Sequence, residues 1–298
     1  MKKLFLVSLA LITLTAAQAQ LKVLPTLKKG MAKVYESKAT ITLPRQSAIN
    51  LSTDTKYTVS DATADGYVID VMTTSFTSDA AASDIAGQIL SASQEMVKDV
   101  NIRIATDKNG KPTGIVNYAE LSKQLDARSK LMINKIYELI PQAKSMLPEE
   151  TLKQQFMESL SEETLFKSLS GNSSPLLLFG KTIMTGAQEE FVNEQGLSMK
   201  RMYFVNGKDV TTNATLNMSK EQVKKMIISQ IEKTMPAQAD AIKGQIDQLM
   251  ESGMLKLDAK ETTTFKLQDD FWPASWTTEV STESAGQQMV TKTTTTLK

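Results

Sequence analysis

Polar and apolar residues alternate with a period of two in many stretches of this sequence. The clearest stretch is 211–218, in which Thr212, Ala214, Leu216 and Met218 alternate with threonine and asparagine. Successive side chains of a strand point to opposite faces, so this pattern is typical of half-buried strands. It predicts strands near 31–43, 51–60, 66–77, 100–106, 113–118, 182–193, 197–206, 209–218, 254–267, 274–283 and 287–297.

Other stretches have apolar residues three and four positions apart, which is typical of helices. They predict a helix near 82–98, helices over 119–170 interrupted at Pro141 and Pro148, and helices over 219–251 interrupted at Pro236. Ser219 and Gln222 have the spacing of a capping box and should open the last of these regions.

Short turns join most of the predicted strands, and Asn109-Gly110 is a strong hairpin signal. Strands joined in this way must be antiparallel, since parallel neighbours need a long crossover. The sequence therefore predicts an α+β fold. Because long antiparallel strands twist and coil, we expect a strongly curved, half-barrel-like sheet with helices packed on its concave face. We expect a single domain over 20–298, in which the helices of 119–170 could form a subdomain.

Residues 1–19 have the features of a secretory signal peptide. Lys2 and Lys3 precede an apolar run, and Ala17 and Ala19 form an Ala-x-Ala cleavage site. The run is too short to span a bilayer, which needs about 20 residues. The sequence has no cysteine that could be lipidated. We therefore expect Sec export to the periplasm or the extracellular space, and no transmembrane segment in the mature chain.

The composition restricts the chemistry available to the protein. The chain has no histidine and no cysteine, which excludes a Ser-His-Asp triad, a thiol nucleophile and the common zinc sites. Its 34 Lys+Arg and 33 Asp+Glu give a formal net charge of +1, so no basic surface is expected to bind nucleic acid. No motif indicates a cofactor or a metal, and we expect no enzymatic activity.

Three weak motifs would indicate an enzyme or a bound ion. Adjacent carboxylates at Glu149-Glu150, Glu162-Glu163, Glu189-Glu190 and Asp269-Asp270 allow a hydrolase, but such neighbours more often cap helices or face solvent. Asp61 to Gly66 lacks the third and twelfth ligands of a calcium loop. Gly110-Lys111 lacks the other residues of a phosphate loop.

Apolar residues provide a different candidate site. The chain has 16 methionines, many of them in predicted helices. Flexible thioethers suit surfaces that accept variable apolar shapes, although methionine also fills irregular cores. Apolar segments near 175–179 and 271–276 could line a hydrophobic cleft or could simply close one end of the sheet. The predicted ligand-binding residues are Leu176, Leu177, Leu178, Phe179, Met226, Phe271, Trp272 and Trp276.

Four segments together resemble a loose group of exported bacterial proteins of unknown function. They are Leu27-Lys28-Lys29-Gly30-Met31, Asp65-Gly66-Tyr67-Val68-Ile69, Asn109-Gly110-Lys111-Pro112, and the stretch from Phe271-Trp272-Pro273 to Thr278. The expected architecture also resembles that of lipoprotein-carrier proteins, whose curved sheet holds acyl chains beneath helices. That likeness implies a fold and transfers no functional residue.

Two main hypotheses for function remain. The first is an apolar small molecule or lipid-like ligand bound between the curved sheet and the helices. The second is a structural or interaction module of the cell envelope, with a protein partner. We favour the first narrowly, and a carboxylate hydrolase is the least favoured alternative.

Overall fold

The computed structural model describes residues 20–42, 48–80, 85–171, 174–193, 196–234, 239–251, 257–284 and 287–298. The predicted signal peptide, residues 1–19, lies outside the described residues.

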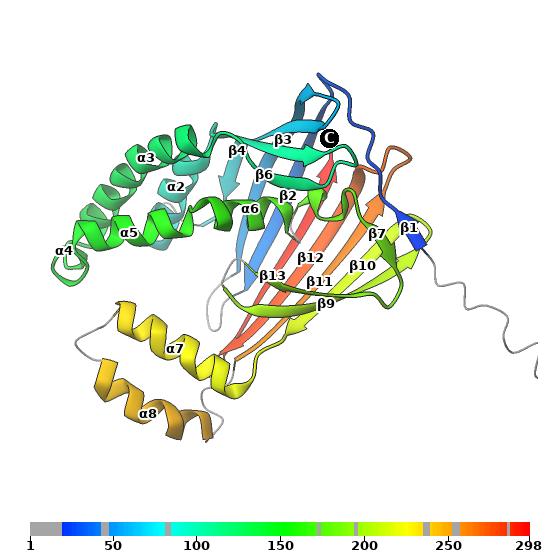
Figure 1. Cartoon of the computed structure of the whole chain (residues 1–298). Helices are drawn as coiled ribbons and strands as arrows, with labels where there is room; N and C mark the ends of the chain where they lie inside the picture. The colour runs from blue at the N-terminus through cyan, green and yellow to red at the C-terminus, as the bar shows by residue number, and fades with distance from the viewer. Residues whose placement is uncertain are drawn as a thin grey trace, which may run out of the picture.

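An antiparallel sheet of eleven strands forms the body of the described structure (Figure 1). Its strand order is β6-β5-β4-β3-β2-β13-β12-β11-β10-β9-β8. The strands are β2 (Ala32–Thr42), β3 (Ile49–Ala62), β4 (Gly66–Ser78), β5 (Asn101–Asp107), β6 (Pro112–Ile115), β8 (Gln188–Val192), β9 (Ser198–Asn206), β10 (Asp209–Leu216), β11 (Leu257–Leu267), β12 (Pro273–Ser284) and β13 (Gln287–Leu297).

The sheet consists of two meanders, in which strands that follow one another along the chain also pair. The first runs from β2 to β6 and the second from β8 to β13. They are joined where β13 pairs with β2, in a register that places Leu297 opposite Tyr35 and Val290 opposite Thr42. The first and last strands of the main sheet along the chain, β2 and β13, thus meet in its middle.

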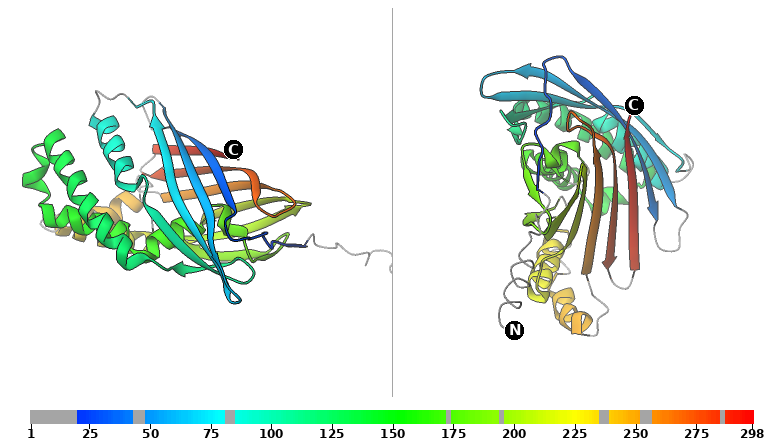
Figure 2. Two further views of the ribbon diagram at one scale, coloured as in Figure 1. Left: turned by 90° about the horizontal axis from the view of Figure 1, so that it is seen from above. Right: turned by 90° about the vertical axis from the view of Figure 1, so that its right-hand side faces the viewer.

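The sheet is open and strongly curved, with β6 and β8 at its edges. Figure 2 shows the strands bending around the segment that contains α6 (Glu162–Ser170). Register shifts in β3 and β11 add to the twist that long antiparallel strands have in any case. The predicted α+β class, with a curved antiparallel sheet and helices against its concave side, is confirmed.

The region 119–170 forms four helices broken near the two prolines, as predicted. They are α3 (Tyr118–Leu139), α4 (Ala143–Met146), α5 (Glu149–Ser159) and α6. Together with α2 (Ile85–Val97) they enclose a core centred on Leu121, Leu125 and Met132. Phe166 of α6 packs against this core and also against the core of the sheet, so the two are continuous.

A second helical pair, α7 (Lys220–Thr234) and α8 (Ala239–Glu251), is inserted between β10 and β11 (Figure 1). The predicted capping box opens α7. The backbone N–H of Ser219 donates to Gln222 Oε1 at 2.7 Å, and the N–H of Gln222 donates to Ser219 Oγ at 3.2 Å. Among the described residues, no helix is both long and apolar enough to cross a bilayer.

The prediction of one strand over 182–193 was wrong. The segment contains two strands, β7 (Thr182–Met184) and β8, separated by a turn in which Gly186 has a φ of +84°. β7 leaves the main sheet and pairs with β1 (Gln20–Lys22), a strand that the sequence pattern did not reveal. The predicted strand 113–118 is also shorter, because it ends at Ile115 and α3 begins at Tyr118.

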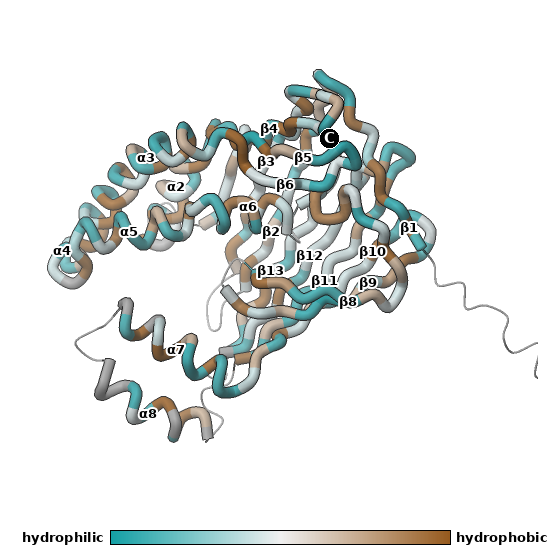
Figure 3. The backbone as a smooth tube through the Cα atoms, viewed as in Figure 1, coloured by the Kyte–Doolittle hydropathy of each residue, from teal (hydrophilic) through white to brown (hydrophobic). Residues whose placement is uncertain are grey.

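Aromatic side chains fill the concave side of the sheet where the two meanders join. Tyr35, Tyr57, Trp272 and Trp276 are almost fully buried and meet edge to face, with ring centroids 5.0–6.2 Å apart. A 3-10 turn, η1 (Pro175–Leu178), packs on this cluster, and Figure 3 shows the apolar stretch around α6 lying over the sheet. This core holds the α6–η1 segment against the concave face.

Candidate functional site

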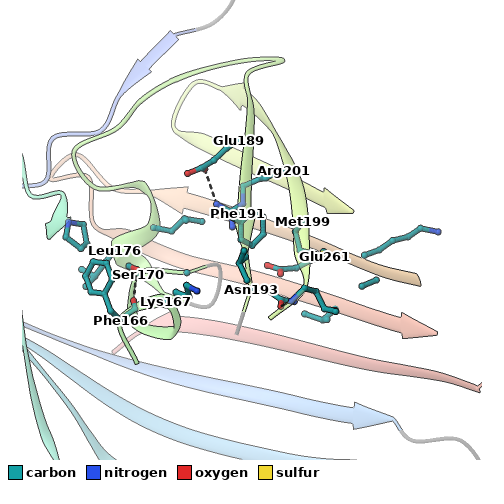
Figure 4. A pocket seen from close by; sticks show the side chains of 18 of the residues that line it. Phe166, Lys167, Ser170, Leu176, Glu189, Phe191, Asn193, Met199, Arg201 and Glu261 are labelled. Atoms are coloured by element: carbon teal, nitrogen blue, oxygen red, sulfur yellow. Dashed lines mark hydrogen bonds and ion pairs between the residues drawn. The ribbon is translucent and has the colours of Figure 1, made fainter. Parts of the chain in front are cut away.

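A cavity of about 650 Å³ lies between the α6–η1 segment and the concave face of the sheet. One wall is formed by α6 and η1, the opposite wall by β8 and β9, and the floor by β11, β12 and β13 (Figure 4). The residues that define its shape are Phe166, Leu176, Leu177, Phe191, Leu197, Met199, Ala259, Val280, Thr282, Met289 and Thr291. The lining is mainly apolar. Charged side chains line it at several places, with Glu189 and Arg201 on the β8–β9 wall, Lys181 beside them, Lys167 on α6, Lys260 and Glu261 on β11, and Lys111 before β6.

The η1 wall is fixed by its own sequence. Proline occupies the first position of the turn, where no intrahelical N–H is needed, and the Ser174 hydroxyl accepts a hydrogen bond from the Leu176 N–H at 3.1 Å. Phe179, directly after the turn, meets Trp272 edge to face at 5.0 Å. This anchoring gives the cavity one rigid apolar wall.

The eight predicted ligand-binding residues occupy three different places. Leu176, Leu177 and Phe179 line the cavity. Leu178, Trp272, Trp276 and the partly buried Phe271 lie in the adjoining core, where they support the wall from behind. Met226 of α7 does not line the cavity, but it packs with Met199 and Ala259, which do.

A polar cluster on the β8–β9 wall was not predicted. Glu189 of β8 receives hydrogen bonds from Lys181 Nζ at 3.1 Å, from Arg201 Nη1 at 3.1 Å and from the Tyr203 hydroxyl. Lys181 Nζ also donates to the Tyr203 oxygen at 3.2 Å. Two cations and one carboxylate are therefore held together on one side of the cavity.

The protonation states of this cluster follow from burial and charge together. Burial alone would raise the pKa of the Glu189 carboxyl, but Lys181, the Tyr203 hydroxyl and Arg201 together lower it. Burial lowers the pKa of the Lys181 ammonium, although the Glu189 charge opposes the shift. Burial also raises the pKa of the Tyr203 hydroxyl, which therefore stays neutral at pH 7. By formal charge, two cationic side chains and one carboxylate give the cluster one net positive charge.

Arg201 is the most unusual member, because its side chain is only 3% exposed. Its guanidinium carbon lies 3.9 Å from the centre of the Phe191 ring, and both of its hydrogen bonds use Nη1. Within the described part of the chain, the buried Nε has no hydrogen-bond partner. Leaving such a donor unsatisfied costs about 1–3 kcal/mol, and more for a charged group. Arg201 thus retains unused capacity to bind an acceptor.

The other carboxylate pairs have ordinary structural roles. Glu149-Glu150 and Glu162-Glu163 occupy the first turns of α5 and α6, where negative charge is favourable. Asp269 and Asp270 accept hydrogen bonds from Lys208 and Lys33. Among the described residues, no three acidic side chains are grouped so that they could hold a metal ion.

The sequence does contain a signal for the cluster, although it is faint. Met199, Arg201 and Tyr203 share one face of β9, and their neighbours at 200 and 202 share the other. A charged residue between two apolar ones on the inward face of a strand must find a partner or a ligand. The partner, Glu189, lies opposite Arg201 in the β8–β9 register.

No family model and no curated protein matches this sequence. Solved structures with a weak similarity to this chain include a lipovitellin and a porin-like protein. The lipovitellin is described under "lipid-protein interactions in lipovitellin", with 9% identity and a TM-score of 0.40 over 92% of this chain and 25% of that chain. The porin-like protein is from Bacteroides uniformis, with 9% identity and a TM-score of 0.18 over 92% and 99% of the two chains. The chain spans about a quarter of the lipovitellin chain, and similarity at this level carries no functional inference.

Proposed function

We propose that this protein is an exported, non-enzymatic binding protein that holds an apolar or amphipathic small molecule between α6–η1 and the concave face of the sheet. The observation that carries the proposal is the cavity itself. Its volume of about 650 Å³ falls in the range of about 300–1,000 Å³ typical of small-molecule sites. Its mostly apolar lining, with a few polar groups at one end, also fits such sites.

The protonation of Glu189 favours binding over hydrolysis. Two carboxylates line the cavity, Glu189 from β8 and Glu261 from β11. A glycosidase needs one carboxyl that stays protonated near neutral pH, which requires a raised pKa. The pKa of Glu189 is lowered by its three partners, so this carboxyl is unsuited to act as the acid.

Binding of a neutral apolar probe tests the proposal. N-phenyl-1-naphthylamine, whose fluorescence rises in apolar surroundings, should bind the purified protein saturably, and native mass spectrometry should detect a co-purified amphiphile. Thr282→Phe places a ring in the cavity and should weaken probe binding about tenfold or more. Ser281→Phe adds the same ring to the opposite face of β12 and serves as the control.

A second cavity variant guards against misfolding of the first. Thr291→Phe enters the same space from β13 and should have the same effect as Thr282→Phe. The proposal is wrong if the probe does not bind saturably, or if both folded cavity variants bind it as well as the wild-type protein does.

A further inference from the structure

We propose that the β8–β9 end of the cavity recognises a carboxylate head group, so that the ligand is a long-chain anionic amphiphile such as a fatty acid. This inference rests on the proposed function and names its ligand class. It is carried by the position, the hydrogen bonding and the charge of Arg201.

The first argument is hydrogen bonding. A guanidinium has five N–H donors, and the edge formed by Nε and Nη2 matches the two oxygens of a carboxylate. Arg201 uses only Nη1 in bonds to Glu189 and Tyr203, and Nε has no acceptor among the described residues. A carboxylate that reaches the Nε–Nη2 edge would satisfy this donor in the bidentate geometry that arginine prefers, and because Nε is buried, its binding requires the side chains that cover this edge to move.

The second argument is charge balance. Lys181 and Arg201 both pair with Glu189, and the Tyr203 hydroxyl adds no charge. Glu261 on the cavity floor is not one of these partners. It lies in the same row across the sheet as Arg201, two strands away with Ala214 between them, so the backbones of Glu261 and Arg201 are roughly 10 Å apart. Thr263 Oγ1 lies within hydrogen-bonding distance of Glu261. The cluster thus keeps an excess positive charge in a partly buried position, which favours a single negative charge on the ligand.

The third argument is the continuity of polar and apolar surfaces. The Phe191 ring lies against the Arg201 guanidinium, and Met199 follows on the same wall (Figure 4). Across the cavity lie Phe166 and Leu176, so an alkyl chain attached to the head group would run between two apolar walls. A free inorganic anion would leave this apolar space unfilled.

Competition against N-phenyl-1-naphthylamine separates these ligand chemistries. The competitors are dodecanoate, dodecan-1-ol and acetate, each below the concentration at which it aggregates. Dodecanoate should displace the probe at concentrations about tenfold lower than dodecan-1-ol, because only the acid engages Arg201. Acetate should not displace the probe at millimolar concentration.

Arg201→Met should reduce the preference for dodecanoate over dodecan-1-ol to about threefold or less, with both displacements corrected for the probe affinity measured in that variant. Lys181→Met, which removes the excess charge without touching the guanidinium, should also reduce it and provides a second variant if Arg201→Met does not fold. Lys200→Met is the matched control, since Lys200 is the exposed neighbour of Arg201 on the other face of β9.

Each outcome has a distinct meaning. Equal displacement by the acid and the alcohol in the wild-type protein would overturn the inference and leave the apolar binding function intact. Displacement of the probe by millimolar acetate would also overturn it. So would a preference for dodecanoate over dodecan-1-ol that is as strong in Arg201→Met as in the wild-type protein. Absence of any saturable probe binding would remove the proposed function together with this inference.

Discussion

The rings of Phe179 and Trp272 meet edge to face, with centroids 5.0 Å apart and an angle of 84° between their planes. Phe179 follows η1, and Trp272 precedes β12, so this contact fastens the cavity wall to the sheet. The indole Nε1–H donates to the carbonyl of Thr26 at 3.1 Å, which adds the N-terminal segment to the same junction. One aromatic pair therefore connects three segments that are distant in the sequence.

Phe179→Ala should destabilise the protein by about 3–5 kcal/mol, because it removes a fully buried ring and leaves a void beside Trp272. Phe204→Ala, on the partly exposed face of β9, should cost about 1 kcal/mol or less. Urea denaturation followed by tryptophan fluorescence measures both, since both tryptophans are buried. Equal losses of unfolding free energy in the two variants would contradict the role of Phe179 as an anchor.

Gly66→Ala should lower the free energy of unfolding by about 1–3 kcal/mol. A Cβ at this position would lie 1.9 Å from the Thr106 carbonyl oxygen on the neighbouring strand, so the backbone has to move. Gly114→Ala in β6 is the matched control, because nothing lies within 4 Å of its added Cβ. Thermal denaturation should show a lower Tm for the first variant only, and a wild-type Tm for Gly66→Ala would refute the expected clash.

The strands were the most predictable part of the fold. In β10, Val210, Thr212 and Ala214 are buried in alternation, as their period of two indicates. The exception was 182–193, because β7 and β8 are separated only by the Gly186 turn, and β7 pairs with a short strand of the N-terminal segment. The local pattern of polar and apolar residues cannot reveal that two strands far apart in the sequence pair with each other.

The cavity was predictable only in part. The apolar run at 176–179 indicated a buried segment, and three of its residues line the cavity. The charged cluster was missed because Glu189 and Arg201 resemble ordinary residues of strands when each is considered alone. Only the β8–β9 register shows that they form a pair, because it places them opposite each other on the inward face. The predicted export and single-domain organisation remain predictions.

The stability contributed by Glu189 should disappear in acid. Its pKa is lower in the folded protein than the value of about 4.3 expected in the unfolded chain, so its contribution is complete above that value and is lost as the pH falls through the folded pKa. Glu189→Gln lacks this contribution at every pH. The difference in unfolding free energy between the wild-type protein and this variant should therefore shrink between about pH 5 and pH 3.

This comparison isolates Glu189 from other acidic groups. Asp61, Asp79, Glu163 and Asp269 also have lowered pKa values, but they are present in both proteins and cancel in the difference. A difference that stays constant from pH 7 to pH 3 would show that folding does not lower the pKa of Glu189.

The buried position of Arg201 should make its ion pair with Glu189 stronger than a surface pair. Arg201→Met and Glu189→Gln, combined in a double-mutant cycle, should give a coupling energy of about 1 kcal/mol, moderated because Glu189 is 38% exposed. Lys167–Glu163, an exposed pair one helical turn apart in α6, provides the matched cycle and should give about 0.3–0.5 kcal/mol. Urea denaturation of the seven proteins, the wild type being shared by the two cycles, measures both couplings. If the two are equal, the cavity end is solvated like the outer surface of α6, and Arg201 has no unbalanced charge to offer a ligand.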